Sequence, residues 1–438
     1  MAAQRGIYIY PVKTVSEART VTEPEFQPDL FDEQHPLYTN LDDIRDTTYL
    51  NDLYFDLGYN NNTNEFEAST DYVKIIFSGH RGCGKSAELR RINKTLHKQD
   101  VYFTVFIDLE QEVEVGSFQY ADFYALLIHK LIEQLDKEEV TTAVATLRAM
   151  ANRLFETETQ ASSTKGSAKT SADLEGSAGF SFFGFGGKAS FKQIFSGENE
   201  ISSTVRREVK RNTLRIINEF NAALVDVRSK VEEKGKGRDI LFIVDGSEKI
   251  QYAVYDELFV KNGNIISEIS VNMLTAVPIT AHYEIEKAPY KFTNRYTVPM
   301  IKLDKYPHAV GKMKEIVAKR IDLSTFIEDG ALEACISYSG GCIRQLFMVV
   351  HTALKKSLGS KIEMEHVARA VKELGQDLWE YLGTAHLEVI KADNFRPADK
   401  PVGELLYMLI LLKYNGVIDV NPLLKAYPDY IEWKNQQA

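Results

Sequence analysis

The stretch Gly79-His80-Arg81-Gly82-Cys83-Gly84-Lys85-Ser86 decides the fold of this chain. Its pattern, Gly-x-x-x-x-Gly-Lys-Ser, is typical of a loop that wraps around phosphate groups. The glycines let backbone N–H groups approach the phosphates, the lysine reaches the β- and γ-phosphates, and the serine hydroxyl is suited to hold Mg²⁺. We therefore expect the segment from Gly79 to Ala87 to bind a nucleoside triphosphate.

The residues on either side of this loop have the pattern that a nucleotide site requires. Residues 73–78 are mostly apolar and predict a buried strand that runs into the loop, and residues 86–92 open a helix. The N-terminus of a helix favours an anion, because its free N–H groups point at the ligand. A simple glycine-rich turn between strand and helix would not need Lys85 and Ser86 beside the last glycine.

A second buried strand supplies the acidic residues. Five consecutive apolar residues, 240–244, precede Asp245, which is therefore placed at the carboxyl end of a strand, where ligands bind in parallel α/β sheets. We predict that Asp245 and Ser86 hold the metal. Glu248, three residues further on, is the candidate that polarises the attacking water. The alternative is a surface carboxylate that begins the next helix.

Two more strands carry polar candidates. Residues 270–278 predict an apolar strand in which Thr275 is the side chain best suited to sense the γ-phosphate, unless it only fills the strand. Residues 292–303 predict a further strand with Arg295 at its entrance. The chain then becomes helical, with apolar residues at a period near 3.6, and Ser339-Gly340-Gly341-Cys342-Ile343-Arg344 interrupts this pattern.

This order of motifs resembles an AAA+-type ATPase of the branch that contains the origin-recognition initiators and the STAND signalling ATPases. The resemblance covers about residues 36–425, although only the phosphate loop and the Asp245 strand are specific. It implies ATP rather than GTP, a lid arginine, Arg344, that reaches the phosphates, and Arg295 as an arginine finger that acts on a neighbouring subunit. For Arg295 an ordinary exposed arginine is the alternative. Relatives often carry Glu where this chain has Gly246.

The resemblance also implies the division of the chain. We expect an extended N-terminal arm (1–65), an α/β P-loop ATPase core with a parallel sheet in three layers (66–305), a helical lid (306–375) and a small winged-helix-like module (376–438). In the last, residues 405–414 predict an apolar helix, followed by the turn Asn415-Gly416 and a short strand. In this family the arm runs beside the adenine pocket, which places residues 35–38 near the base.

One segment inside the core has an unusual composition. Residues 158–200 are rich in Ser, Gly, Ala and Lys and then become aromatic at 180–187, which predicts a flexible or hairpin insert. The aromatic part is either a partner site or a hairpin folded back on the core. The helix predicted over 202–233 has Arg207, Lys210 and Arg211 on one face, which suits nucleic-acid phosphates or, with its neighbouring acids, a solvated face.

Composition sets the class of protein. The chain has 438 residues, 44% hydrophobic residues and a net charge of −10, which suits a globular protein of two or three domains and disfavours coating of nucleic acid. Its three cysteines match a reducing compartment. No signal peptide or membrane span is recognisable. We expect a cytoplasmic protein without a membrane partner.

Three functions are compatible with this sequence. The first is a Mg²⁺- and ATP-dependent switch, an ATPase that assembles with copies of itself and regulates an effector protein, as in STAND systems that include bacterial anti-phage defence. The second is an initiator-like ATPase that loads onto DNA through its C-terminal module. The third is an ATP-binding scaffold with little hydrolysis, which Gly246 would explain. The acidic net charge favours the first function.

Overall fold

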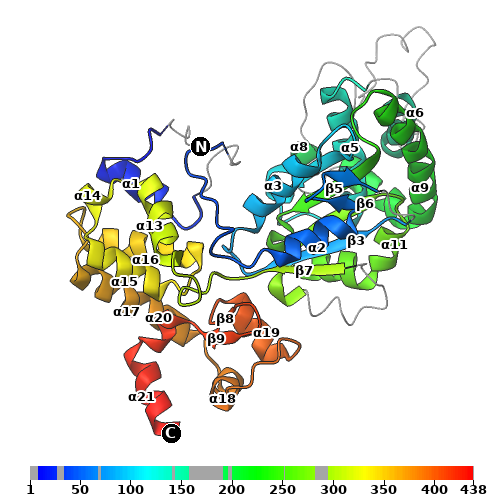
Figure 1. Cartoon of the computed structure of the whole chain (residues 1–438). Helices are drawn as coiled ribbons and strands as arrows, with labels where there is room; N and C mark the ends of the chain where they lie inside the picture. The colour runs from blue at the N-terminus through cyan, green and yellow to red at the C-terminus, as the bar shows by residue number, and fades with distance from the viewer. Residues whose placement is uncertain are drawn as a thin grey trace, which may run out of the picture.

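A five-stranded parallel sheet forms the centre of the protein in a computed structural model that describes residues 8–26, 34–67, 71–140, 144–156, 191–195, 200–250, 252–281 and 294–437 (Figure 1). The strand order is β4-β5-β6-β3-β7. The strands are β3 (Lys74–Gly79), β4 (Tyr102–Asp108), β5 (Asp239–Asp245), β6 (Asn272–Pro278) and β7 (Asn294–Val298). The prediction of an α/β core with a parallel sheet is therefore confirmed.

Helices cover both faces of this sheet, because its central strands are apolar on both sides. One face packs against α2 (Thr48–Asp56) and α3 (Lys85–Leu96), beside the small hairpin of β1 (Tyr59–Asn60) and β2 (Glu65–Phe66). The other face packs against α5 (Tyr120–Lys137), α6 (Val144–Glu156) and α9 (Glu200–Glu233). The three layers are visible in Figure 1.

The register of the sheet brings the predicted motifs to one edge. Strand β3 pairs with β6 on one side and β7 on the other, and β6 also pairs with β5. The phosphate loop and Asp245 therefore leave the same edge of the sheet with one strand between them. On the far side of β5, Asp108 lies opposite Asp245 in the register. The short helix α4 (Leu109–Glu112) follows it.

The described part of the predicted insert belongs to the core. The aromatic stretch 180–187 lies outside the described residues, but Phe191–Phe195 forms α8, and the rings of Phe191 and Phe195 stack at 4.2 Å inside the core. The basic start of α9 is also engaged within the protein. Arg206 is buried and paired with Asp122 at 2.8 Å, and Lys210 and Arg215 each donate to a neighbouring side chain.

A second lobe is built from helices and has its own core. It contains α13 (Ala309–Arg320), α14 (Leu323–Phe326), α15 (Asp329–Tyr338), α16 (Ile343–Lys356) and α17 (Met364–Glu380). Sequence periodicity predicted that this region is helical. The lid was placed at 306–375, and α17 continues five residues beyond that limit.

The N-terminal region was predicted to be an extended arm, but its described residues, 8–26 and 34–65, contain two helices and the start of a hairpin. Helix α1 (Val15–Val21) lies on the lid lobe, where Val12, Ala18 and Val21 are buried (Figure 1). Helix α2 and the β1–β2 hairpin instead complete the core lobe. The region divides between two lobes because each of its helices has an apolar face that a lobe can bury.

The C-terminal lobe contains α18 (Thr384–Ala392), α19 (Lys400–Tyr407), an antiparallel pair of strands, β8 (Leu411–Lys413) and β9 (Ile418–Val420), and then α20 (Pro422–Lys425) and α21 (Pro428–Gln437). The helix predicted over 405–414 is wrong in its second half. Leu409 has a left-handed backbone (φ 61°), which ends the helix, and Asn421 donates to the Leu409 carbonyl. None of the helices in the described ranges is both long and apolar enough to span a membrane.

Candidate nucleotide-binding site

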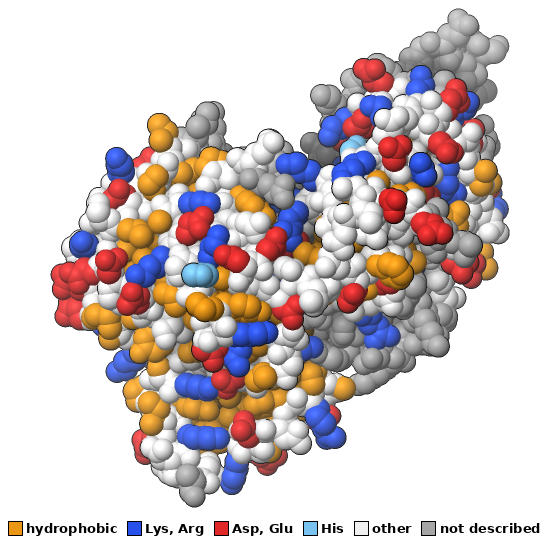
Figure 2. Space-filling model, in the orientation of Figure 1, with side chains coloured by type: hydrophobic (Ala, Val, Ile, Leu, Met, Phe, Trp, Pro, Cys, Tyr) orange, Lys and Arg blue, Asp and Glu red, His pale blue; other side chains and the backbone are white. Residues whose placement is uncertain are grey.

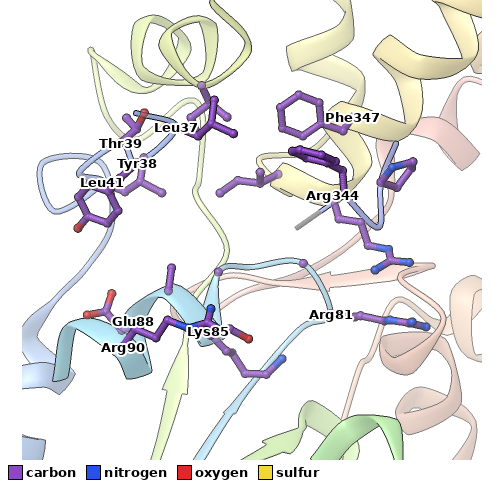
Figure 3. Close-up of a pocket in the computed structure, with 18 of the residues that line it drawn as sticks. Leu37, Tyr38, Thr39, Leu41, Arg81, Lys85, Glu88, Arg90, Arg344 and Phe347 are labelled. Atoms are coloured by element: carbon purple, nitrogen blue, oxygen red, sulfur yellow. The ribbon is translucent and has the colours of Figure 1, made fainter. Parts of the chain in front are cut away.

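One cavity lies where the phosphate loop, the lid and the N-terminal region meet. Residues of the loop and of α3 form one wall, residues 24–26 and 37–45 a second, and residues of α13 and α16 a third. Figure 3 shows Lys85 and Arg90 on the first wall, with Leu37 and Phe347 across the opening. Basic side chains also lie along the hollow between the lobes in Figure 2.

The phosphate loop has the geometry that its sequence predicts. Gly82 and Gly84 have left-handed backbones, with φ of 80° and 95°, so a side chain at either position would be strained. The Lys85 ammonium is buried and donates to the carbonyls of Gly79 and His80, both at 3.1 Å. Burial alone would lower its pKa, but Glu248 and other neighbours raise the pKa above its ordinary value. Lys85 therefore stays charged beside the loop.

The loop residues do not all face the cavity. Arg81, Gly82, Gly84, Lys85, Ser86 and Ala87 line it. The side chains of His80 and Cys83 are buried elsewhere, and the His80 Nε2 accepts a hydrogen bond from the Lys413 N–H of β8 at 2.7 Å. The backbone of these two residues still belongs to the loop. Their side chains serve the packing of the loop rather than contact with a ligand in this cavity.

Ser86 and Asp245 come together at the edge of the sheet. The Asp245 carboxylate is hydrogen-bonded to the Ser86 side chain, and it is 2% exposed. Burial, and then the charge of Glu248, raises the pKa of Asp245 to about 6. Mg²⁺ binds oxygen ligands and commonly combines one or two carboxylates with the phosphates of a substrate. This buried hydroxyl–carboxylate pair fits that requirement.

Glu248 reaches the site because of the turn before it. Gly246 has a left-handed backbone (φ 80°) and begins the short 3₁₀ helix Ser247–Lys249. This turn brings the Glu248 carboxylate back toward Lys85, with 3.8 Å between Oε1 and Nζ. The Oε2 atom is buried and has no hydrogen-bond partner within the described protein. Glu248 is thus an inward-facing acid, and its interpretation as a surface carboxylate does not fit this geometry.

Thr275 and Arg295 lie away from the cavity wall. In the sheet register both are opposite Ile76 of β3, three residues before Gly79. Thr275 is buried, and its hydroxyl oxygen has no hydrogen-bond partner among the described residues. Arg295 is half-buried on the edge strand β7. The predicted roles of these two residues, in sensing the γ-phosphate and in acting on a neighbouring subunit, remain predictions.

Arg344 crosses the phosphate loop but is held by an acid. A Cβ added to Gly82 would lie 2.1 Å from the Arg344 Cβ, so the stem of Arg344 rests directly on the loop. Its guanidinium pairs with Glu25, with 3.1 Å between Nη1 and Oε2. Arg81 lies 3.8 Å from the same carboxylate. The sequence predicted an arginine at this place, but not its partner Glu25.

Several residues that line the cavity were not predicted from the sequence. Arg45 is 6% exposed and donates to the Cys83 carbonyl of the phosphate loop at 2.7 Å. Arg320 lies over the ring of Phe347 at 3.8 Å and over that of Phe26 at 5.4 Å. Phe347 follows Arg344 by one helical turn, so its spacing was a readable signal. The other residues carry no motif, and only the fold brings them here.

The apolar end of the cavity suits a flat base. Leu37, Leu41, Ile316, Ile343 and Phe347 line this end, opposite the loop. Leu37 and Tyr38 also belong to the segment 35–38 that was expected near the base (Figure 3). Burial lowers the pKa of Arg320 to about 10, so its guanidinium remains charged at neutral pH. The cavity therefore combines an apolar part, which also holds Arg320, with the cations Arg81, Lys85 and Arg344 at the loop.

Comparisons with known proteins find similarity only among solved structures. No family model and no curated protein matches the chain. A Walker-type ATPase of Pyrococcus abyssi is 12% identical, with a TM-score of 0.39 over 81% of this chain and 90% of that one. Cdc6p from Pyrobaculum aerophilum is 10% identical, with a TM-score of 0.36 over 95% of this chain and 98% of that one.

Proposed function

We propose that this protein is a Mg²⁺- and ATP-dependent molecular switch that hydrolyses ATP and regulates a partner protein. One observation carries the proposal: Lys85, Ser86, Asp245 and Glu248, from segments far apart in the sequence, converge on one edge of the sheet. A buried lysine beside one buried carboxylate and one partly buried carboxylate has few structural uses at the mouth of a cavity. The same four groups provide the parts that phosphoryl transfer requires.

Each residue has a separate task in this proposal. The loop amides and Lys85 bind the phosphates, and Ser86 and Asp245 hold the metal. When bound, Mg²⁺ supplies positive charge between the phosphate oxygens. Glu248 orients a water molecule, because its Oε2 is buried and unpartnered and therefore remains able to accept a proton. This supports an enzyme over the scaffold that Gly246 had suggested.

The lid provides the means of switching. Arg344 belongs to α16 of the lid and rests on Gly82 of the core, so the two lobes meet at the phosphate loop. A ligand that offers Arg344 a γ-phosphate stabilises a different lid position from one that does not. This difference in contact free energy is what a switch requires. We also propose that copies of this chain assemble as STAND ATPases do. The assembly regulates an effector protein, and anti-phage defence is one setting for this role.

The C-terminal lobe favours a protein partner over DNA. Lys425 of this lobe is paired with Asp419 at 2.6 Å and 2.8 Å, so its charge is already balanced within the protein. Lys413 lies in β8, and its backbone N–H is bound to the phosphate loop. Figure 2 shows acidic side chains among the basic ones over the visible face. DNA binding with a steep dependence on salt would reverse this preference.

Nucleotide retention tests the proposal directly. Wild type and Lys85→Ala are compared for binding of Mg²⁺–ATP by calorimetry, with Lys94→Ala on the same helix as the matched control. We expect Lys85→Ala to lose at least about tenfold in affinity, because it removes the buried charge that faces the phosphates. Lys94→Ala should match the wild type. Equal retention by Lys85→Ala and wild type would contradict the proposal.

A further inference from the structure

Two arginines of the nucleotide site share a single acid. The guanidinium groups of Arg81 and Arg344 lie on the same side of the phosphate loop (Figure 3). The Glu25 carboxylate lies 3.8 Å from Arg81 and bonds both terminal nitrogens of Arg344, one of them at 3.1 Å. Two neighbouring guanidinium groups repel each other, so they need an anion between them. In this structure Glu25 is that anion.

Glu25 also lies where a ligand would meet it. Pro24, Glu25 and Phe26 all line the nucleotide cavity, together with Arg81, Lys85 and Arg344. The stem of Arg344 rests on Gly82, so in this lid position the outer part of the side chain is the part that can change partner. A carboxylate and a terminal phosphate group are both negatively charged, and two oxygens of either can accept bidentate hydrogen bonds from arginine. The two anions therefore compete for the same guanidinium groups.

We propose that Glu25 takes the place of a terminal phosphate and must be displaced when a nucleoside triphosphate binds. Glu25 is then a specificity-determining residue, because it weakens binding of the ligand whose last phosphate reaches Arg81 and Arg344. A diphosphate that stops at Lys85 leaves Glu25 where it is. This inference rests on the proposed function and adds to it the group that discriminates between the two nucleotides.

The solvent exposure of Glu25 and Arg344 sets the size of the expected effect on ATP affinity. The Glu25 side chain is 61% exposed and the Arg344 side chain 17%, so water screens this pair in part. An exposed ion pair typically changes an equilibrium by about two- to fivefold, and Glu25 forms two such pairs. We expect its removal to raise the affinity for Mg²⁺–ATP by about three- to tenfold at low salt. The gain should shrink as salt increases, because ions screen exposed charges.

Replacement of Glu25 by Gln tests this directly, because it removes the charge and retains the shape. The Kd values for Mg²⁺–ATP and Mg²⁺–ADP are measured by calorimetry on the full chain at about 50 mM and 500 mM salt. The expected result is tighter ATP binding with little change for ADP. Glu23→Gln, which changes an exposed acid two residues earlier on the same segment, is the matched control and should behave as wild type.

A double variant tests whether Glu25 acts through Arg344. If Glu25 acts through Arg344, Glu25→Gln should give a smaller gain in ATP affinity in an Arg344→Gln background than in the wild type. Equal effects on ATP and ADP, an unchanged Kd for ATP, or the same change in Glu23→Gln would each overturn the inference. Those outcomes leave the proposed function intact, provided that wild type retains ATP and Lys85→Ala does not. If neither retains it, both proposals fall.

Discussion

At the scale of single residues, Gly246 and Glu248 act together. The absence of an acid directly after Asp245 had cast doubt on hydrolysis. The structure gives Gly246 a left-handed backbone, which an acidic side chain would adopt only with strain. The same turn directs the next acid, Glu248, to within 3.8 Å of the Lys85 ammonium. Glu248 therefore comes three residues after Asp245 rather than directly after it, yet its carboxylate still reaches the site.

Replacement of Glu248 by Gln should separate binding from turnover. We expect ATP turnover to fall by about 100-fold or more, because a correctly placed general base contributes that much. The Kd for Mg²⁺–ATP should change little, since Gln retains the size of the side chain. Phosphate release measures the first quantity and calorimetry the second.

The matched control changes an acid on a neighbouring segment. Glu110 pairs with Lys249, which follows Glu248, yet its side chain is 48% exposed. Glu110→Gln should therefore retain wild-type turnover. Turnover of Glu248→Gln equal to that of the wild type would remove Glu248 from the mechanism and restore the scaffold interpretation.

At the scale of elements, the hairpin of β8 and β9 connects the C-terminal lobe to the nucleotide site. Lys413 of β8 donates its N–H to His80, and the Tyr414 hydroxyl donates to the Gly340 carbonyl in the lid motif at 2.8 Å. Leu412 packs with Cys83 and Cys342 in the core beneath the loop. One short strand therefore contacts both the phosphate loop and the lid.

The contact between His80 and β8 should make stability sensitive to acid. Burial, and then the charge of Lys85, lowers the pKa of His80 to about 3, against an ordinary value of about 6.5. Between these values the unfolded chain binds a proton that the folded chain does not. The free energy of unfolding therefore falls as pH falls below 6.5, by about 2 kcal/mol from this group at pH 5.0.

His80→Gln should remove this part of the acid sensitivity, because an amide oxygen can accept the Lys413 N–H without titrating. Urea unfolding at pH 7.5 and pH 5.0, without nucleotide, measures the difference between the two proteins. His308→Gln, at an exposed histidine before α13, is the control and should lose as much stability as wild type. If wild type and His80→Gln lose the same stability, His80 is not a buried neutral acceptor.

At the scale of the whole molecule, three lobes contact one another around the phosphate loop, and the cavity itself is lined by the core, the lid and the N-terminal region. The N-terminal region belongs to two of them, since α1 packs with the lid and α2 with the core sheet. The C-terminal lobe buries Ile279, which follows β6 of the core. Each lobe contacts the phosphate loop, so a change in the conformation of the loop alters its contacts with all three lobes. This arrangement suits a protein whose nucleotide state controls its shape.

Replacement of Arg295 tests whether a neighbouring copy of the chain contributes to ATP turnover. It lies on the edge strand β7 and outside the wall of its own cavity, so its predicted role requires a neighbouring copy of the chain. We expect Arg295→Ala to retain the affinity of wild type for Mg²⁺–ATP and to lose about tenfold or more in turnover at protein concentrations where wild type assembles. Sedimentation velocity and turnover over a range of protein concentrations measure both effects.

Arg369→Ala, on the exposed side of the lid helix α17, is the matched control and should resemble wild type. Turnover of Arg295→Ala equal to that of wild type at every concentration would reduce Arg295 to a structural residue of β7. Assembly would then need another explanation.

Local sequence determined the strands of the sheet, the phosphate loop and the acids at and just beyond the end of β5. Apolar runs bounded by glycine or a charged residue indicate buried strands wherever they occur, and Gly-x-x-x-x-Gly-Lys-Ser specifies a backbone shape through its own residues. For this reason the local sequence predicted Lys85, Ser86 and Asp245 as nucleotide-site residues, whereas Arg344 was expected from the resemblance of the lid motif. The order of the motifs along the chain also indicated which strand precedes the phosphate loop and which strand ends at Asp245.

Only the tertiary structure decided where Glu25, Arg45 and His80 belong. Each of these side chains pairs with a group far away in the sequence, and no local pattern encodes such a pair. The division of residues 8–67 between two lobes and the strand β8 have the same origin. An apolar segment such as 405–414 suits either a helix or a strand, and the surface that buries it determines which one forms.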